Sequence, residues 1–168
     1  MHPIYRQLLI YLFCLLPLTA RADTDFSYLT LQGIQTVAVD VEGINKALYR
    51  YHFDPATIKK SVEKKLADAG FKIISVREAL HHNAASLIKL TFNDIRSEYG
   101  FYSYGVDLSV KEKIPLPRRE NAFISATIWQ KAKHGMMMDY EVEKLQKAVD
   151  ELIASFLDEY REQNSTKS

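Results

Sequence analysis

The chain has 168 residues, with 22 Lys and Arg against 21 Asp and Glu, a single Cys, and 47% hydrophobic residues. This near-neutral balance excludes a disordered polyelectrolyte and a protein that binds nucleic acid through bulk positive charge. A chain of this length buries about 70% of the surface that its unfolded form exposes, which is enough for one core without cross-links. We therefore expect a single small domain.

The first 22 residues have the three parts of a secretory signal. A short basic start ends at Arg6, an apolar run extends from Leu8 to Leu18, and small residues lie at Ala20 and Ala22. The run is too short to cross a membrane, which takes about 20 apolar residues. We predict a signal peptide at 1–22, one domain at 23–162, a frayed tail at 163–168, and a periplasmic or secreted protein with no membrane span after cleavage.

The only cysteine lies inside this signal. Cys14 follows Phe13, whereas a lipidation site has small residues directly before its cysteine, so we expect no lipid anchor. Cleavage after Ala22 leaves a mature chain without cysteine. Disulfides, zinc-cysteine sites and thiol catalysis are therefore excluded for the mature protein.

The first half of the mature chain predicts strand, helix, strand. Residues 33–42 alternate apolar and polar positions, which is typical of a half-buried strand. Asp54 and Pro55 open a helix that Gly70 closes. Residues 71–76 form a short β-branched run, and one helical turn is expected over 78–82.

The second half predicts three strands and a long helix. The strands are expected over 87–95, 102–110 and 123–131, with a loop over 115–121 before the last. Asp139 is the predicted cap of a terminal helix whose apolar stripe ends at Tyr160. This order predicts an α+β two-layer sandwich, in which a mainly antiparallel four- to five-stranded sheet carries two main helices on one face. The sheet face without helices is then either half polar or a binding surface.

Four segments carry a resemblance to known proteins. They are 31–34 leading into 39–43, 66–72, 126–129, and the end of the terminal helix near 156–160. In these the chain resembles a group of small exported bacterial proteins of unknown function. Its layout is also similar to small periplasmic assembly accessories, such as the lipoprotein partner of the lipopolysaccharide translocon, although it lacks their lipidated cysteine. The resemblance implies a role in the cell envelope.

The histidines do not have the spacing of a metal site. His81 and His82 are adjacent, so their rings diverge on a helix or a strand. His134 precedes Met136, Met137 and Met138, a soft ligand set that suits Cu(I). Because Met137 points away from its neighbours in an extended chain, we favour a packing role for these methionines. We predict no metal site and no cofactor.

Catalytic motifs are also missing from the sequence. It has no Gly-x-Ser-x-Gly elbow and no phosphate-binding glycine loop. Asp40 and Glu42 share one strand face, but solvation or an ion pair explains such acid pairs more often than general acid–base catalysis does. We therefore expect a binding protein, not an enzyme.

Aromatic residues provide the candidate binding surface. Strand periodicity places Phe123, Thr127 and Trp129 on one side, opposite Ile124, Ala126 and Ile128, and the first side is the one expected to lie away from the helices. The predicted partner-binding residues are Tyr99, Phe101, Phe123, Thr127 and Trp129. The alternative is that these rings pack as cross-strand neighbours, covered by residues 26–31.

The function predicted from these observations is an exported cell-envelope binding module, a protein-interaction or assembly accessory. The competing function is a carrier of a small apolar ligand such as a lipid, held between the sheet and the terminal helix or on the aromatic face. The expected partner is an envelope protein or a lipid and not nucleic acid. The sequence leaves the oligomeric state open.

Overall fold

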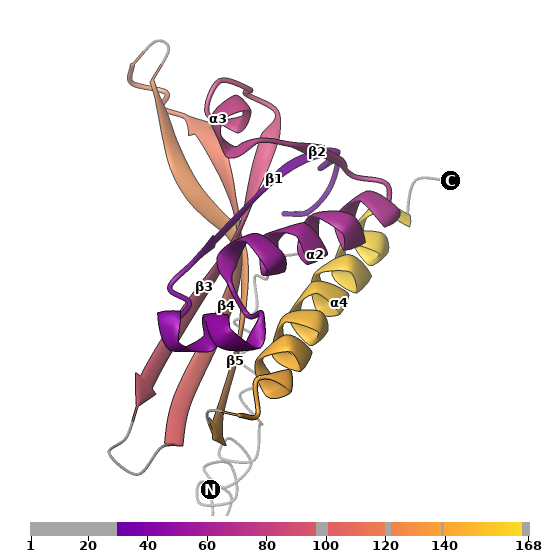
Figure 1. Ribbon diagram of the computed structural model, residues 1–168. Coiled ribbons are helices and arrows are strands. Elements are labelled where there is room, and N and C mark those ends of the chain that lie inside the picture. Colours follow the sequence, from indigo (N-terminus) through magenta and orange to yellow (C-terminus); the bar gives the residue numbers. More distant parts are fainter. Residues whose placement is uncertain (1–29, 97–100, 120–121, 139, 166–168) are drawn as a thin grey trace, which may run out of the picture.

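The computed structural model describes residues 30–96, 101–119, 122–138 and 140–165 (Figure 1). The predicted signal peptide and Asp139 lie outside the described residues. The elements are, in chain order, β1 (Thr36–Glu42), the 3₁₀ helix η2 (Lys46–Tyr51), α2 (Pro55–Asp68), β2 (Lys72–Ile74), α3 (Val76–Ala79), β3 (Ala85–Arg96), β4 (Phe101–Pro115), β5 (Phe123–Met138) and α4 (Glu143–Ser165).

The strands form one mixed sheet in the order β2-β1-β3-β4-β5. β1 pairs in parallel with both β2 and β3, whereas β3, β4 and β5 form an antiparallel meander. The predicted α+β two-layer sandwich is thus confirmed. The longest ladders are antiparallel, as predicted, and the two parallel pairings both involve β1.

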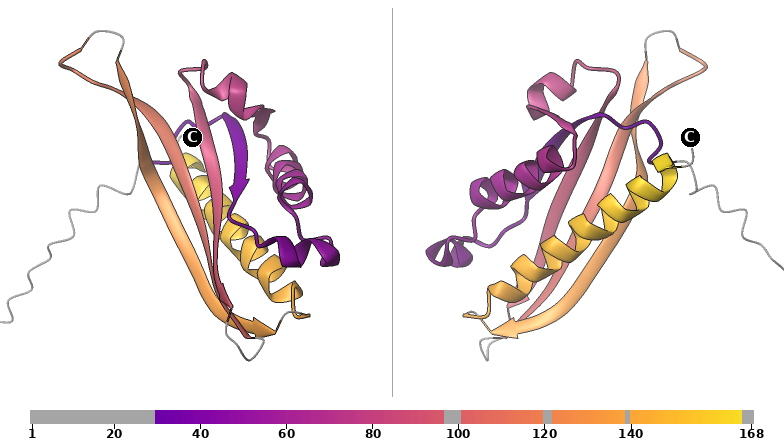
Figure 2. Two further views of the ribbon diagram at one scale, coloured as in Figure 1. Left: turned by 60° about the vertical axis from the view of Figure 1, so that its left-hand side comes forward. Right: turned by 90° about the vertical axis from the view of Figure 1, so that its right-hand side faces the viewer.

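Helices α2 and α4 lie side by side on one face of this sheet (Figure 2). Ile58, Val62 and Leu66 recur every fourth residue on α2 and are buried, because this spacing puts them on one helical face. The corresponding buried residues of α4 are Leu145, Ala148, Val149, Leu152, Ile153 and Phe156. An ion pair of 2.6 Å between Lys65 and Asp150 joins the two helices above the core.

The ends of α2 are those that its sequence predicts. The Asp54 side chain accepts hydrogen bonds from the backbone N–H groups of Ala56 and Thr57, both at 3.0 Å, and Pro55 follows it. Gly70 adopts a φ of 97°, which L side chains rarely tolerate, and so turns the chain out of the helix.

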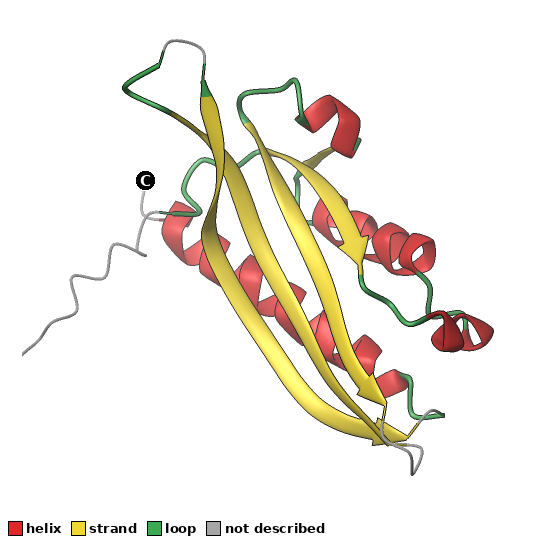
Figure 3. Ribbon diagram, turned by 90° about the vertical axis from the view of Figure 1, so that its left-hand side faces the viewer, coloured by secondary structure: helices red, strands yellow, loops and turns green. Residues whose placement is uncertain are grey.

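The short helix α3 lies on the opposite face of the sheet, over one corner (Figure 3). It packs Ala79 against Ala38 and Ala85 in a small second cluster. Its first turn is fixed by a capping box between Ser75 and Glu78. The helical turn predicted at 78–82 therefore begins earlier, at Val76, because Ser75 supplies the cap.

The end of α4 differs from the prediction. The helix continues to Ser165, so the frayed tail predicted from Gln163 is wrong for residues 163–165. Gln163 Oε1 accepts a hydrogen bond from the Leu31 N–H, and Asn164 Oδ1 accepts one from the Gly33 N–H, both at 2.9 Å. These contacts with the segment before β1 hold the last helical turn in place.

Candidate binding surface

Trp129 does not lie on an exposed face, and its predicted exposure is wrong. Its side chain is only 8% exposed. Its indole Nε1 donates a hydrogen bond to Glu159 Oε2 of α4, and its ring meets the Phe156 ring edge-on, with 5.6 Å between centroids. Trp129 is thus part of the main core between sheet and helices.

A β-bulge explains this reversal. Val110 of β4 pairs with Trp129, but the next residue, Lys111, pairs with Thr127, so Ile128 is an extra residue in β5. One extra residue moves every later side chain to the other face of the sheet. Thr127 therefore points away from α4 while Trp129 points toward it. Strict alternation read from the sequence cannot reveal such an insertion.

The remaining predicted residues do not form one surface. Phe123 pairs with Pro115 at one end of β4, whereas Phe101 pairs with Met138 at the other. β4 has 15 residues, so its two ends lie about 45 Å apart at roughly 3.3 Å per residue. Tyr99 lies outside the described residues. Phe123 and the exposed Thr127 share the end of the hairpin formed by β4 and β5.

This end of the hairpin, residues 111–119 and 122–127, is called the hairpin end below. It extends past the C-terminal end of α4 (Figure 1). Ile114, Phe123 and Ile124 are 40%, 44% and 46% exposed. Ile114 pairs directly with Ile124, and Phe123 with Pro115 in the adjacent pair, so the hairpin end presents apolar side chains on both of its faces. The prediction missed both residues: it placed Ile124 on the side of the strand expected to face the core, and it made no assignment for Ile114.

The hairpin end is also positively charged, although the whole chain is nearly neutral. Its described residues include Lys111, Lys113, Arg118 and Arg119, and the one carboxylate among them is Glu112. Glu112 accepts a hydrogen bond from the Ser86 hydroxyl at 2.8 Å. Within the described part of the chain none of the four cations forms an ion pair, although Lys111 is near enough to Glu42 to help lower the pKa of that carboxyl.

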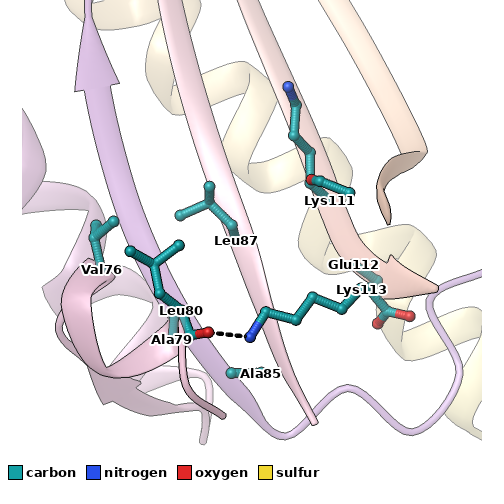
Figure 4. Close-up of a pocket in the computed structure, with 9 residues that line it drawn as sticks. Val76, Ala79, Leu80, Ala85, Leu87, Lys111, Glu112 and Lys113 are labelled. Carbon is teal, nitrogen blue, oxygen red and sulfur yellow. Dashed lines mark hydrogen bonds between the residues drawn. The ribbon is translucent and has the colours of Figure 1, made fainter. Parts of the chain in front are cut away.

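An apolar pocket of about 90 Å³ lies between α3 and the hairpin end (Figure 4). Its wall comes from α3, the start of β3 and the two strands of the hairpin. The lining residues are Val76, Ala79, Leu80, Ala85, Leu87, Lys111, Glu112, Lys113 and Ser125. The Lys113 ammonium donates a hydrogen bond to the Leu80 carbonyl oxygen, so its side chain joins the hairpin to α3 across one side of the pocket.

The middle of the sheet face opposite α2 and α4 carries polar side chains that pair with one another. Lys89 forms an ion pair of 2.8 Å with Glu42, and this hydrogen-bonded contact is the main cause that holds the pKa of Glu42 below its ordinary value. Asn93 donates a hydrogen bond to Asp107 at 3.1 Å. These side chains lie between the hairpin end and a second pair of exposed apolar side chains at the other end of β4 and β5, Phe101 and Met136, which are 38% and 65% exposed.

The methionine segment alternates as predicted. Met137 is 2% exposed and belongs to the core, whereas Met136 is 65% exposed and points the other way. His134 is exposed and lies against Gly105 of the neighbouring strand, where an added Cβ would come within 2.9 Å of its Nδ1. Within residues 30–96, 101–119, 122–138 and 140–165, no three His, Cys, Asp or Glu side chains are grouped to hold a metal.

Comparisons with known proteins do not place the chain in a family. No protein-family model matches it, and no curated protein sequence matches it. A crystal structure of a minor lipoprotein from Acinetobacter baumannii is similar, with 9% sequence identity over 76% of this chain and 90% of that chain, and a TM-score of 0.36. A TM-score at this level does not establish a common fold. Among the described helices, none is long and apolar enough to cross a membrane.

Proposed function

We propose that this chain is an exported cell-envelope binding module, a protein-interaction or assembly accessory that binds its partner through the hairpin end. The single observation that carries this proposal is the projecting hairpin with Ile114, Phe123 and Ile124 exposed. Exposed apolar side chains surrounded by charged ones are typical of a protein interface. Export is proposed from the signal peptide that the sequence predicts at residues 1–22.

The size of the pockets favours a docking role over the competing function, a carrier of a small apolar ligand. Two pockets that described residues line have volumes of about 90 and 10 Å³. Sites that enclose a small molecule usually have about 300–1,000 Å³. Side chains from all five strands and both long helices fill the described interior. In this proposal the chain binds a macromolecule and catalyses no reaction.

Site-specific crosslinking in the cells that make the protein tests this function. A photoreactive benzoylphenylalanine at position 123 should give discrete adducts with a partner protein. The matched control is the same group at position 136, because Met136 is also exposed on β5 but lies at the far end of the strand. Equal adducts at both positions, or none at 114, 123 and 124, would contradict a binding role for the hairpin end.

A second measurement separates binding from folding. The double variant Ile114→Ser/Ile124→Ser should remain folded and lose about 1–3 kcal/mol of stability, because the two side chains are 40% and 46% exposed and each loses only part of what a fully buried isoleucine contributes. It should nevertheless lose the adducts at position 123. If the exported protein instead releases a tightly held lipid in native mass spectrometry, the carrier function replaces the one proposed.

A further inference from the structure

We propose that the pocket between α3 and the hairpin end holds one small aliphatic side chain from an acidic segment of the partner protein. This inference rests on the proposed function and adds the chemistry of the partner. It requires three properties of the pocket: a size that fits one side chain, an apolar lining, and a rim with a net positive charge.

The size fits a single side chain. A cavity of about 150 Å³ holds a benzene molecule, so the present pocket of about 90 Å³ accepts a somewhat smaller group, such as a valine or leucine side chain. A complete acyl chain does not fit in this volume. The pocket therefore favours a protein segment over a lipid as the occupant.

Apolar side chains from two parts of the chain line the pocket. Val76 of α3 and Leu80, directly after it, approach from one part, and Leu87 approaches from β3 (Figure 4). Leu80, the residue directly after α3, is 64% exposed. Its large apolar side chain therefore lies in water beside the opening of the pocket. A partner side chain that covers Leu80 and fills the pocket removes this surface from water, at about 25 cal/mol per Å² of apolar area.

The rim carries a net positive charge, because Lys111 and Lys113 line the pocket with one carboxylate, Glu112, between them. Lys113 gives its hydrogen bond to a backbone carbonyl, which is neutral, so the charge of the ammonium is not cancelled there. Lys111 is near enough to Glu42 to help lower the pKa of that carboxyl, so Lys113 is the main cation at the opening. Arg118 and Arg119 continue the positive charge toward the tip of the hairpin. Carboxylates on either side of the inserted side chain complement this charge and fix the register of the segment.

Titration with defined peptides tests this inference directly. The probe is the acetylated, amidated peptide Asp-Glu-Leu-Glu-Asp, added to isotope-labelled exported protein and followed by amide chemical shifts. We expect saturable shifts at Ala79, Leu87 and Ser125. A peptide with Ser in place of Leu should bind at least fivefold more weakly, and one with Lys in place of the four acidic residues should not bind.

Two variants with matched controls locate the site. Ser125→Leu fills the pocket from an exposed strand position and should weaken binding at least tenfold, whereas Ser103→Leu, exposed near the other end of β4, should not. Lys111→Glu should weaken peptide binding more than Lys60→Glu does. Lys60 is exposed on α2, so its replacement changes the net charge of the protein by the same amount at a site away from the pocket. Unchanged amide spectra away from the substituted residues show that each variant is folded.

Three results would overturn the inference. The first is equal affinity of the leucine and serine peptides for the protein. The second is peptide binding by Ser125→Leu that is as tight as binding by the natural protein. The third is that phosphatidylglycerol vesicles shift the same amide signals whereas the peptide does not. The crosslinks at position 123 serve as an independent readout. If the crosslinks at position 123 form but the acidic peptide does not bind, the proposed function stands and only the inference of an acidic partner segment is refuted.

Discussion

Trp129 and Glu159 connect the middle of β5 to α4 through a hydrogen bond of 2.5 Å. Lys131, two residues along β5, forms an ion pair with the same carboxylate. Partial burial raises the pKa of Glu159, but the hydrogen bonds from Lys131 and Trp129 together with the lysine charge outweigh it, so the pKa lies below its ordinary value. The carboxylate is thus held in its charged form between two donors.

Replacing Trp129 by Phe should remove one of these donors and keep an aromatic ring in the core. We expect the free energy of unfolding to fall by about 1–3 kcal/mol, since hydrogen bonds to charged groups contribute about this much and some packing is lost. Urea unfolding at pH 7 measures the change. Phe123→Leu is the control on the same strand and should change stability by less than about 1 kcal/mol, because Phe123 is exposed. A larger loss in the control would show that the exposed ring is part of a core.

The pH dependence of the Glu159→Gln variant provides a separate check. Because the folded-state pKa is lowered, the ionised carboxylate stabilises the fold above its ordinary pKa of 4.5, and this contribution is lost as the pH falls through the folded-state pKa. The variant should be less stable than the natural protein at pH 7, and the difference should narrow below pH 4.5. Chemical unfolding from pH 7 to pH 3 measures it. A constant difference would mean that the charge of Glu159 contributes nothing.

The buried stripe of α4 should dominate the stability of the domain. Leu152→Ala and Phe156→Ala should each cost about 2–5 kcal/mol, through lost transfer energy and the cavity left behind. Met136→Ala serves as the control, since this large apolar side chain is mostly in water and its removal should cost less than about 1 kcal/mol. Similar costs at all three positions would contradict the packing described.

The elements that could be predicted from the sequence are those whose signals are local. Asp54 and Pro55 mark the start of α2, and the four-residue spacing of its apolar residues identifies the buried side. The bulge at Ile128 is not local in this sense, because it depends on how β5 pairs with β4, and it moved Trp129 from the predicted surface into the core. For the same reason the exposed Ile114 and Ile124 were not predicted: only the relative lengths of hairpin and helix show that α4 does not cover them.

Two glycines with nearly the same backbone angle allow a matched comparison. Gly33 has φ 79° with no atom near an added Cβ, whereas Gly43 has φ 82° and an added Cβ would lie 2.1 Å from the Phe92 carbonyl oxygen. Gly33→Ala should cost about 1–2 kcal/mol for the left-handed conformation alone. Gly43→Ala should cost at least about 2 kcal/mol more, because backbone must move. Thermal melts of both variants measure the difference, and equal costs would show that β1 and β3 separate easily at this point.

The contacts between α4 and the segment before β1 should be measurable as well. Gln163→Ala/Asn164→Ala leaves the N–H groups of Leu31 and Gly33 without these acceptors and should cost about 1–3 kcal/mol. The control is Arg161→Ala, which removes an exposed pair with Asp158 and should cost less than about 0.5 kcal/mol. If the double variant is as stable as the control, the last turn of α4 does not hold this segment.

The parallel pairing of β1 with both β2 and β3 has a consequence for the order in which the domain assembles. Glu42 pairs with Thr91, which follows it by 49 residues, so β1 leaves the ribosome long before the strand that completes its pairing. The meander of β3, β4 and β5 requires only hairpin contacts, which form faster than parallel pairings of distant segments. We therefore expect β1 to join late, by adding to the open edge of β3, and Val37 and Val39, which are buried in the folded domain, to remain exposed until then. The kinetic consequence expected from this topology is slow refolding, with aggregation that increases with protein concentration.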